Sequence, residues 1–200
     1  ILYIRQHICM YNGIEYRKEN IRDAVEIVAH MKSYHPLVSY LDSLTWDGVP
    51  RLDTWLTNYA GVEDDPLYRE YGRITLLSAV ARAYEPGIKA DYVLVLEGRQ
   101  RMGKSLLIRT LAEPWFADFR VDPKNKDTVQ QMRGKWIVEF AEMHAAKKAD
   151  IDELKAFITR QHDEVRLPYR ANPDYLPRQC IFIGTINSRE DVGYFRDDEN

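Results

Sequence analysis

Eight consecutive residues in the middle of the chain have types and a spacing that suit phosphate binding. The run from Gly98 to Ser105 matches G-x-x-x-x-G-K-[ST], a pattern typical of loops that hold the phosphate chain of a nucleotide. In such loops the lysine reaches the β- and γ-phosphates, and the hydroxyl that follows it is a ligand for Mg²⁺. We therefore predict a site for a nucleotide and Mg²⁺, formed by Gly98, Arg99, Gln100, Arg101, Met102, Gly103, Lys104, Ser105 and Leu106.

The segments on both sides of this loop are those that a phosphate-binding loop requires. Before it, residues 92–96 form a short apolar run that predicts a buried strand, and after it residues 104–112 have a helical pattern. A strand–loop–helix unit points several backbone N–H groups and a helix N-terminus at one place, which suits an anion. The alternative is a chance match on an ordinary turn, and the correct flanks favour the nucleotide site.

Two glutamates in a second predicted strand, residues 136–141, and just after it are candidates for catalysis and, with Ser105, for metal binding. Glu139 lies inside the apolar run, and Glu142 follows it. Ligands of open parallel sheets bind at the carboxyl ends of the strands, so we predict that Glu142 is the base or orients the attacking water. An unpaired carboxylate inside a core strand is costly, so Glu139 should face a metal ion, water or a cation. The alternative places Glu139 at a sheet edge and Glu142 at a solvated strand end.

A third predicted strand, residues 180–186, is followed by the polar residue Asn187. At the carboxyl edge of the sheet, the Asn187 amide could hydrogen-bond the γ-phosphate or the attacking water, so we include it among the catalytic residues. The alternative is an ordinary asparagine that ends the strand and begins a turn with Ser188.

The composition limits the class of protein. The chain has 200 residues, of which 45% are apolar, and a formal net charge of −3, so no general basic field indicates nucleic-acid binding. Its two cysteines, Cys9 and Cys180, are too few for a metal cluster or a disulfide framework. Without a signal peptide or a long apolar run, we expect a soluble, cytoplasmic protein that does not bind membranes. Because the chain starts at Ile1 and stops in a polar run, we expect an excised fragment.

The hydrophobic pattern predicts a helical segment over residues 1–88 and an α/β core over residues 89–200. In the first segment we expect one helix capped by Asn20, a second over residues 37–44, a third over 52–59 and a fourth over 67–84. In the core, helices are expected over 104–112, 126–132 and 150–161, the last with Asp150 as its cap. Strands that alternate with helices predict a parallel sheet.

Short motifs spread over nearly the whole chain occur in an order that is specific to one family. They are His35-Pro36, Leu44 to Leu52, Leu96-Glu97-Gly98 with Gln100, Gly103-Lys104-Ser105, Gly134 to Glu139 with Glu142, Leu154 to Phe157, Arg166 with Pro168-Tyr169, and Gly184-Thr185 with Asn187. The chain therefore resembles the virulence-associated protein E family of phage and plasmid ATPases, related to superfamily 3 helicases and poxvirus-type primase-helicases. The resemblance implies an AAA+-like P-loop NTPase core, hydrolysis of ATP, a homo-oligomeric ring and a role in replicating phage or other mobile DNA.

Two departures from the family pattern concern arginines. Relatives usually carry glycine where this chain has Arg101, and a positive φ there would cost about 1 kcal/mol. Either the loop is tighter than in relatives, or Arg101 contacts a phosphate or DNA. Relatives also continue into a segment whose arginines are expected to act on the γ-phosphate, and this chain ends at Asn200 before such a segment. We therefore expect the chain to bind ATP and hydrolyse it weakly.

Three functions are compatible with these residues. The first is a DNA helicase or initiator motor, in which Lys155, Arg166, Arg170 and Arg178 would line a channel for single-stranded DNA, although such charges are equally typical of a solvated surface. The second is an ATP-gated DNA-binding or assembly module without helicase activity. The third is a small-molecule kinase, which the absence of an arginine-rich lid and the presence of Asn187 disfavour.

Overall fold

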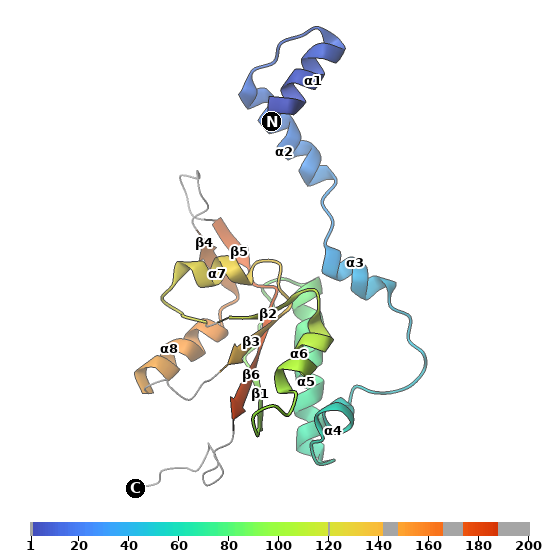
Figure 1. Ribbon diagram of the computed structural model, residues 1–200, viewed down its shortest axis with the longest axis vertical. Coiled ribbons are helices and arrows are strands. Elements are labelled where there is room, and N and C mark those ends of the chain that lie inside the picture. Colours follow the sequence, from blue (N-terminus) through green and yellow to red (C-terminus); the bar gives the residue numbers. More distant parts are fainter. Residues whose placement is uncertain (1, 120, 142–147, 166–173, 188–200) are drawn as a thin grey trace. The chain divides into compact units, whose positions relative to one another are not determined.

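The computed structural model describes residues 2–119, 121–141, 148–165 and 174–187, and the chain divides into two compact units, Ile1–Leu44 and Thr45–Asn200. The described part of the first unit contains the helices α1 (Leu2–Asn12), α2 (Lys18–Met31) and α3 (Pro36–Ser43) (Figure 1). Within these described ranges, none of the helices of the chain combines the length and the apolarity that crossing a membrane requires.

Two helix starts in the first unit can be compared with the sequence. Helix α2 begins at Lys18 with Arg17 as its N-cap, so the prediction that Asn20 caps this helix is wrong. Lys18 and Glu19 are good helix formers, and an acidic residue in the first turn is favourable, which extends the helix past Asn20. Helix α3 begins one residue before its predicted start, with Pro36 in its first turn and the His35 side chain accepting a hydrogen bond from the Val38 N–H.

The second unit is an α/β structure around a four-stranded parallel sheet with the strand order β1-β6-β3-β2, so the predicted α/β class with preceding helices is confirmed. Its strands are β1 (Leu94–Gly98), β2 (Phe116–Asp118), β3 (Ile137–Ala141) and β6 (Ile181–Asn187). A separate antiparallel pair consists of β4 (His162–Val165) and β5 (Asp174–Pro177). The helices are α4 (Trp55–Ala60), α5 (Pro66–Tyr84), α6 (Lys104–Ala112), α7 (Lys126–Met132) and α8 (Lys148–Ile158).

The sequence places the long elements well and misses the short ones. Helices α6 and α7 have the predicted ends, and the three predicted strands are found within two residues of their predicted bounds. Helix α8 begins at Lys148, so Asp150 lies inside it and the prediction that Asp150 is its cap is wrong. The sequence does not predict strands β2, β4 and β5. Each has only three or four residues and includes polar ones, so none forms an apolar run that would indicate a strand.

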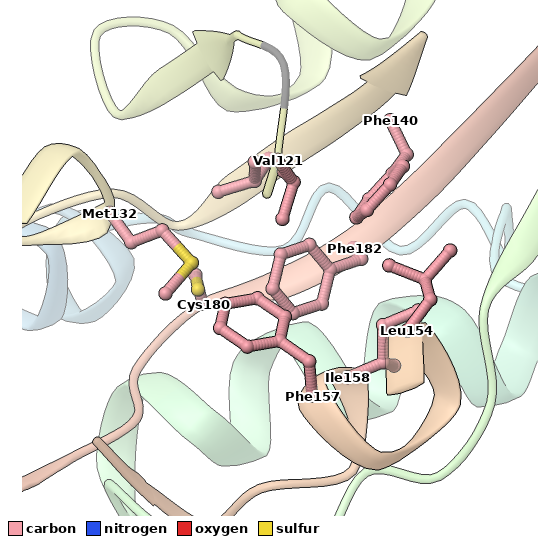
Figure 2. Packing of buried hydrophobic residues seen from close by; sticks show 9 residues of the cluster. Val121, Met132, Phe140, Leu154, Phe157, Ile158, Cys180 and Phe182 are labelled. Atoms are coloured by element: carbon pink, nitrogen blue, oxygen red, sulfur yellow. The ribbon is translucent and has the colours of Figure 1, made fainter. Parts of the chain in front are cut away.

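One face of the sheet packs on α7 and α8. Alternate residues of β3 and β6 point to this face, and the Phe182 ring lies between those of Phe140 and Phe157, with ring centroids 5.8 and 6.0 Å away (Figure 2). Burial raises the pKa of the Cys180 thiol in the same cluster to about 11, so it is a neutral core group. The cluster of buried side chains consists of Val121, Met132, Val138, Phe140, Leu154, Phe157, Ile158, Cys180 and Phe182.

Helix α5 is joined to the sheet by buried polar bonds. The Arg82 guanidinium donates hydrogen bonds to the carbonyl oxygens of Cys180 at 2.6 Å and Ile88 at 3.1 Å, and the Trp136 indole N–H donates to the Ala79 carbonyl at 2.8 Å. These bonds tie α5 to the residues that open β3 and β6. The chain divides into its two compact units after Leu44, and the predicted domain boundary after residue 88 stays a prediction.

Candidate functional site

The loop between β1 and α6 has an unusual backbone. Gly103, directly before α6, has a φ of 86°, and Arg101 has a φ of 70°. Within the described ranges, Arg101 is the one residue other than glycine with a positive φ. Arg101 therefore has the positive φ whose cost the sequence analysis considered. This left-handed conformation costs a residue with a Cβ atom about 1 kcal/mol. The loop stores strain at the place where a site is predicted.

Lys104, the first residue of α6, turns its side chain back over the loop. Its Nζ donates hydrogen bonds to the carbonyl oxygens of Gly98 at 2.7 Å and Arg99 at 2.9 Å, and to Asn187 Oδ1 at 3.2 Å. An ammonium group has three protons, so these three acceptors match its donor capacity. Lys104 thus joins the loop to the end of β6.

Glu139 is buried, with 2% of its surface exposed, and lies on the sheet face that meets α6. Its Oε1 accepts hydrogen bonds from Ser105 Oγ at 2.6 Å and from Thr185 Oγ1 at 2.8 Å. Its Oε2 is buried and has no hydrogen-bond partner among the described residues. Because β3 lies between β6 and β2, the alternative that places Glu139 at a sheet edge is wrong.

Thr185 is a residue of this site to which sequence analysis gave no role. It is the one side chain with a polar group in the buried run from Ile181 to Ile186, and 7% of it is exposed. A signal was available, because Thr185 precedes Asn187 by two residues and side chains two apart in a strand point to the same face. A buried hydroxyl in a strand needs a partner, and the partner here is Glu139.

Asn187 ends β6 beside the loop. In the parallel register of β1 and β6 it pairs with Gly98, which ends β1. The end of β6, the loop and the start of α6 therefore meet at the carboxyl edge of the sheet, the edge at which ligands of parallel sheets bind. Its amide oxygen accepts a hydrogen bond from Lys104, and its predicted part in catalysis stays a prediction.

These residues surround one open cavity of about 380 Å³. Gly98 and Arg99 contribute carbonyl oxygens to Lys104 and lie outside the lining. Glu142 lies outside the described residues, so its predicted role stays a prediction. The lining residues are Gln100, Arg101, Met102, Gly103, Lys104, Ser105, Leu106, Glu139, Thr185 and Asn187, and Met102 and Leu106 are largely exposed.

The residues present fit a magnesium ion that arrives with a nucleotide. Among the described residues, no group of three or more His, Cys, Asp or Glu side chains is placed to hold a metal ion alone. Mg²⁺ commonly keeps several waters and takes one or two carboxylates together with phosphate oxygens. The Ser105 hydroxyl and the buried, unpartnered Oε2 of Glu139 can supply such a share of ligands. Unpartnered buried carboxylate oxygens are costly unless a cation or water meets them.

One predicted DNA-contacting residue does not lie at the surface. Arg178 is buried, and its guanidinium makes a bidentate ion pair with Asp163 and donates to the carbonyl oxygen of Phe157 at 2.5 Å. The prediction that Arg178 lines a DNA channel is therefore wrong, because the ion pair and the carbonyl bonds use its donors within the fold. Lys155 is exposed on α8, and Arg166 and Arg170 lie outside the described residues.

The chain is similar to one family and to solved structures. A model of the virulence-associated protein E-like domain matches residues 41–200. An apo structure of the NrS-1 C-terminal region is 21% identical with a TM-score of 0.46, and the match covers 71% of this chain and 34% of that chain. A second apo structure of that region is 18% identical with a TM-score of 0.40, covering 69% and 31%. This chain spans about a third of the length of those chains, and no curated protein matches it.

Proposed function

The chain belongs to the virulence-associated protein E-like domain family, and on this premise we propose that it binds ATP with Mg²⁺ in the cavity at the carboxyl edge of its sheet. One observation carries the proposal. Lys104 and Ser105 of the loop, Glu139 of β3 and Asn187 of β6 line the same cavity, although they are far apart in the sequence. We further propose that the second unit is a P-loop NTPase core of the AAA+ type.

The loop provides three means of binding a phosphate chain. The first residues of α6 line the cavity, the first-turn N–H groups of a helix have no partner within the helix, and the helix dipole favours an anion there. Lys104 supplies a positive charge, and its three present acceptors are neutral oxygens that phosphate oxygens can replace. Arg101 lines the same cavity and adds a guanidinium charge to the ammonium charge of Lys104.

Ser105 and Glu139 are the residues that would hold Mg²⁺, which when bound would neutralise charge on the phosphates. Glu139 holds the Ser105 hydroxyl by a hydrogen bond of 2.6 Å, so the orientation of this hydroxyl is fixed from the sheet. We propose that Asn187, which lines the cavity, orients a water molecule or a phosphate oxygen there. We propose Glu142 as the base that completes ATP hydrolysis, on its position in the sequence.

For the whole protein we propose a superfamily 3-type motor that acts in the replication of phage or mobile-element DNA, as a homo-oligomeric ring on single-stranded DNA. Support comes from the family and from the exposed position of Lys155 on α8. Strand displacement by the whole protein would separate a motor from an ATP-gated assembly module, and a screen of phosphate acceptors would reveal a kinase. DNA affinity should fall steeply from low to physiological salt, because binding to phosphates releases counterions.

The binding proposal is tested by replacing Lys104 with alanine. Lys104→Ala removes the charge that faces the phosphates, and ATP affinity measured by calorimetry should fall at least tenfold, about 1.4 kcal/mol. Lys89→Ala is the matched control, because Lys89 is an exposed lysine outside the cavity lining. Equal ATP affinity for wild type and Lys104→Ala would show that the loop does not bind the phosphates.

A further inference from the structure

The structure assigns a role to Thr185: we propose that it is a positioning residue that orients the Glu139 carboxylate, so that Oε2 is the oxygen available to the nucleotide-bound cation. This inference rests on the proposed function, since it names how one residue prepares the same cavity. Thr185 would not touch the nucleotide or the cation in this role. It would act through Glu139.

The two oxygens of Glu139 have different surroundings. Two hydroxyl groups, from Ser105 on α6 and Thr185 on β6, meet at Oε1 at distances of 2.6 and 2.8 Å. Oε2 has no hydrogen-bond partner among the described residues, although it is buried. A carboxylate that is held by one oxygen from two sides has little freedom to rotate. Oε2 then keeps a fixed direction. Leaving it buried without a hydrogen-bond donor from the protein costs free energy.

The sheet register explains why Thr185 can do this. Glu139 pairs with Ile183 of β6, and Thr185 is two residues further along the same face, where it pairs with Ala141. Its hydroxyl therefore approaches the Glu139 carboxylate along the strand direction from the carboxyl edge of the sheet. Ser105 approaches the same oxygen from α6. The contact joins β6, β3 and α6, the three elements that form the cavity.

Packing alone gives no reason for a hydroxyl at this position. Valine has the same shape as threonine, is common in strands and would avoid the burial of a polar group. The neighbouring positions of the buried run, Ile183 and Ile186, are aliphatic. Threonine is β-branched, so its χ1 angle is restricted and the hydroxyl keeps one direction. These properties suit a residue that orients another side chain.

Thr185→Val tests the role, since it removes the hydroxyl and keeps the shape. We expect the Mg²⁺ concentration that gives half-maximal stimulation of ATP binding to rise about 10- to 100-fold, the usual effect of losing a group that orients a metal ligand. ATP affinity in EDTA should stay near the wild-type value, because the loop and Lys104 do not depend on Thr185. Thr185→Ser should restore the wild-type Mg²⁺ dependence.

Thr75→Val is the matched control. Thr75 is buried to a similar degree, 8% exposed, and its hydroxyl donates to the Tyr71 carbonyl within α5. Thr75→Val should change the free energy of unfolding and leave the Mg²⁺ dependence of ATP binding unchanged. A purely structural role for Thr185 would give this same result for Thr185→Val. If Thr185→Val does not fold, as judged by circular dichroism, Thr185→Ala takes its place with the same expectation.

The outcomes separate this inference from the proposed function. An unchanged Mg²⁺ dependence in the folded Thr185 variant, with weakened ATP binding in Lys104→Ala, overturns the role of Thr185 and keeps the nucleotide site. Unchanged ATP binding in Lys104→Ala overturns both. A raised Mg²⁺ requirement in Thr185→Val that Thr185→Ser restores supports both.

Discussion

Among the described residues of the second unit, two carboxylates are buried, and their surroundings differ. Asp163 of β4 is 5% exposed, and both of its oxygens accept hydrogen bonds from the Arg178 guanidinium. Arg178 in turn donates to the carbonyl oxygens of Phe157 and Ile158, which end α8. Glu139 of β3 is buried even more completely. One of its oxygens accepts hydrogen bonds from two neutral hydroxyl groups, and the other has no hydrogen-bond partner among the described residues.

The comparison separates a structural acid, Asp163, from Glu139, the acid that we propose to be functional. A buried charge with a complete set of partners ties elements together, and here the Asp163–Arg178 pair ties β4 and the residue that follows β5 to the end of α8. A buried charge with an incomplete set lowers stability unless a bound group completes it. Arg101, with its strained backbone, lines the same cavity as Glu139. Both costs are at the carboxyl edge of the sheet, which is where function and stability are expected to compete.

The largest expected effect is on the structural acid. Asp163→Ala leaves Arg178 buried without its ion-pair partner, and the free energy of unfolding should fall by about 3–5 kcal/mol. Urea denaturation measures this change. Asp118→Ala is the control, because Asp118 forms an exposed ion pair with Arg109 and its loss should cost about 1 kcal/mol or less. Similar losses in the two variants would mean that the buried pair has no special structural role.

Glu139, the proposed functional acid, should respond to substitution in the opposite way. Glu139→Gln replaces a buried, half-satisfied charge by a neutral amide of the same shape, so the free energy of unfolding should stay the same or rise by up to about 2 kcal/mol. Glu97→Gln, on an exposed glutamate of β1, controls for the loss of one negative charge. A loss of more than about 2 kcal/mol in Glu139→Gln would place this residue with Asp163 as a structural group.

The smallest expected effect concerns the strained loop. At a φ of 70°, glycine is less strained than alanine, so Arg101→Gly should be more stable than Arg101→Ala by about 1 kcal/mol. Both variants lack the guanidinium, so their difference in urea denaturation isolates the backbone strain. Equal stability of the two variants would show that the loop relaxes around this residue. ATP affinity should fall in both if Arg101 contributes charge to the loop.

The sequence predicts the elements that form the site better than the contacts between their side chains. The loop, its flanking strand and helix, Glu139 and Asn187 were all found because motif spacing and apolar runs are local signals. The strand spacing places Thr185 on the same face as Asn187, but the Thr185–Glu139 bond and the Asp163–Arg178 pair join residues far apart in the sequence, and no local pattern reveals these partners. The sequence predicts that Arg178 lines a DNA channel, because the local pattern around an arginine is the same whether or not the folded chain gives it a buried partner.

In the proposed function, Glu139 keeps one carboxylate oxygen for a cation that arrives with the nucleotide. The most direct test is calorimetry of ATP binding to wild type and Glu139→Gln, each in excess Mg²⁺ and in EDTA. We predict that Mg²⁺ strengthens ATP binding to the wild type at least tenfold, about 1.4 kcal/mol, and that this ratio falls close to one in Glu139→Gln while the affinity in EDTA is unchanged. The same Mg²⁺ stimulation in both proteins would contradict the account.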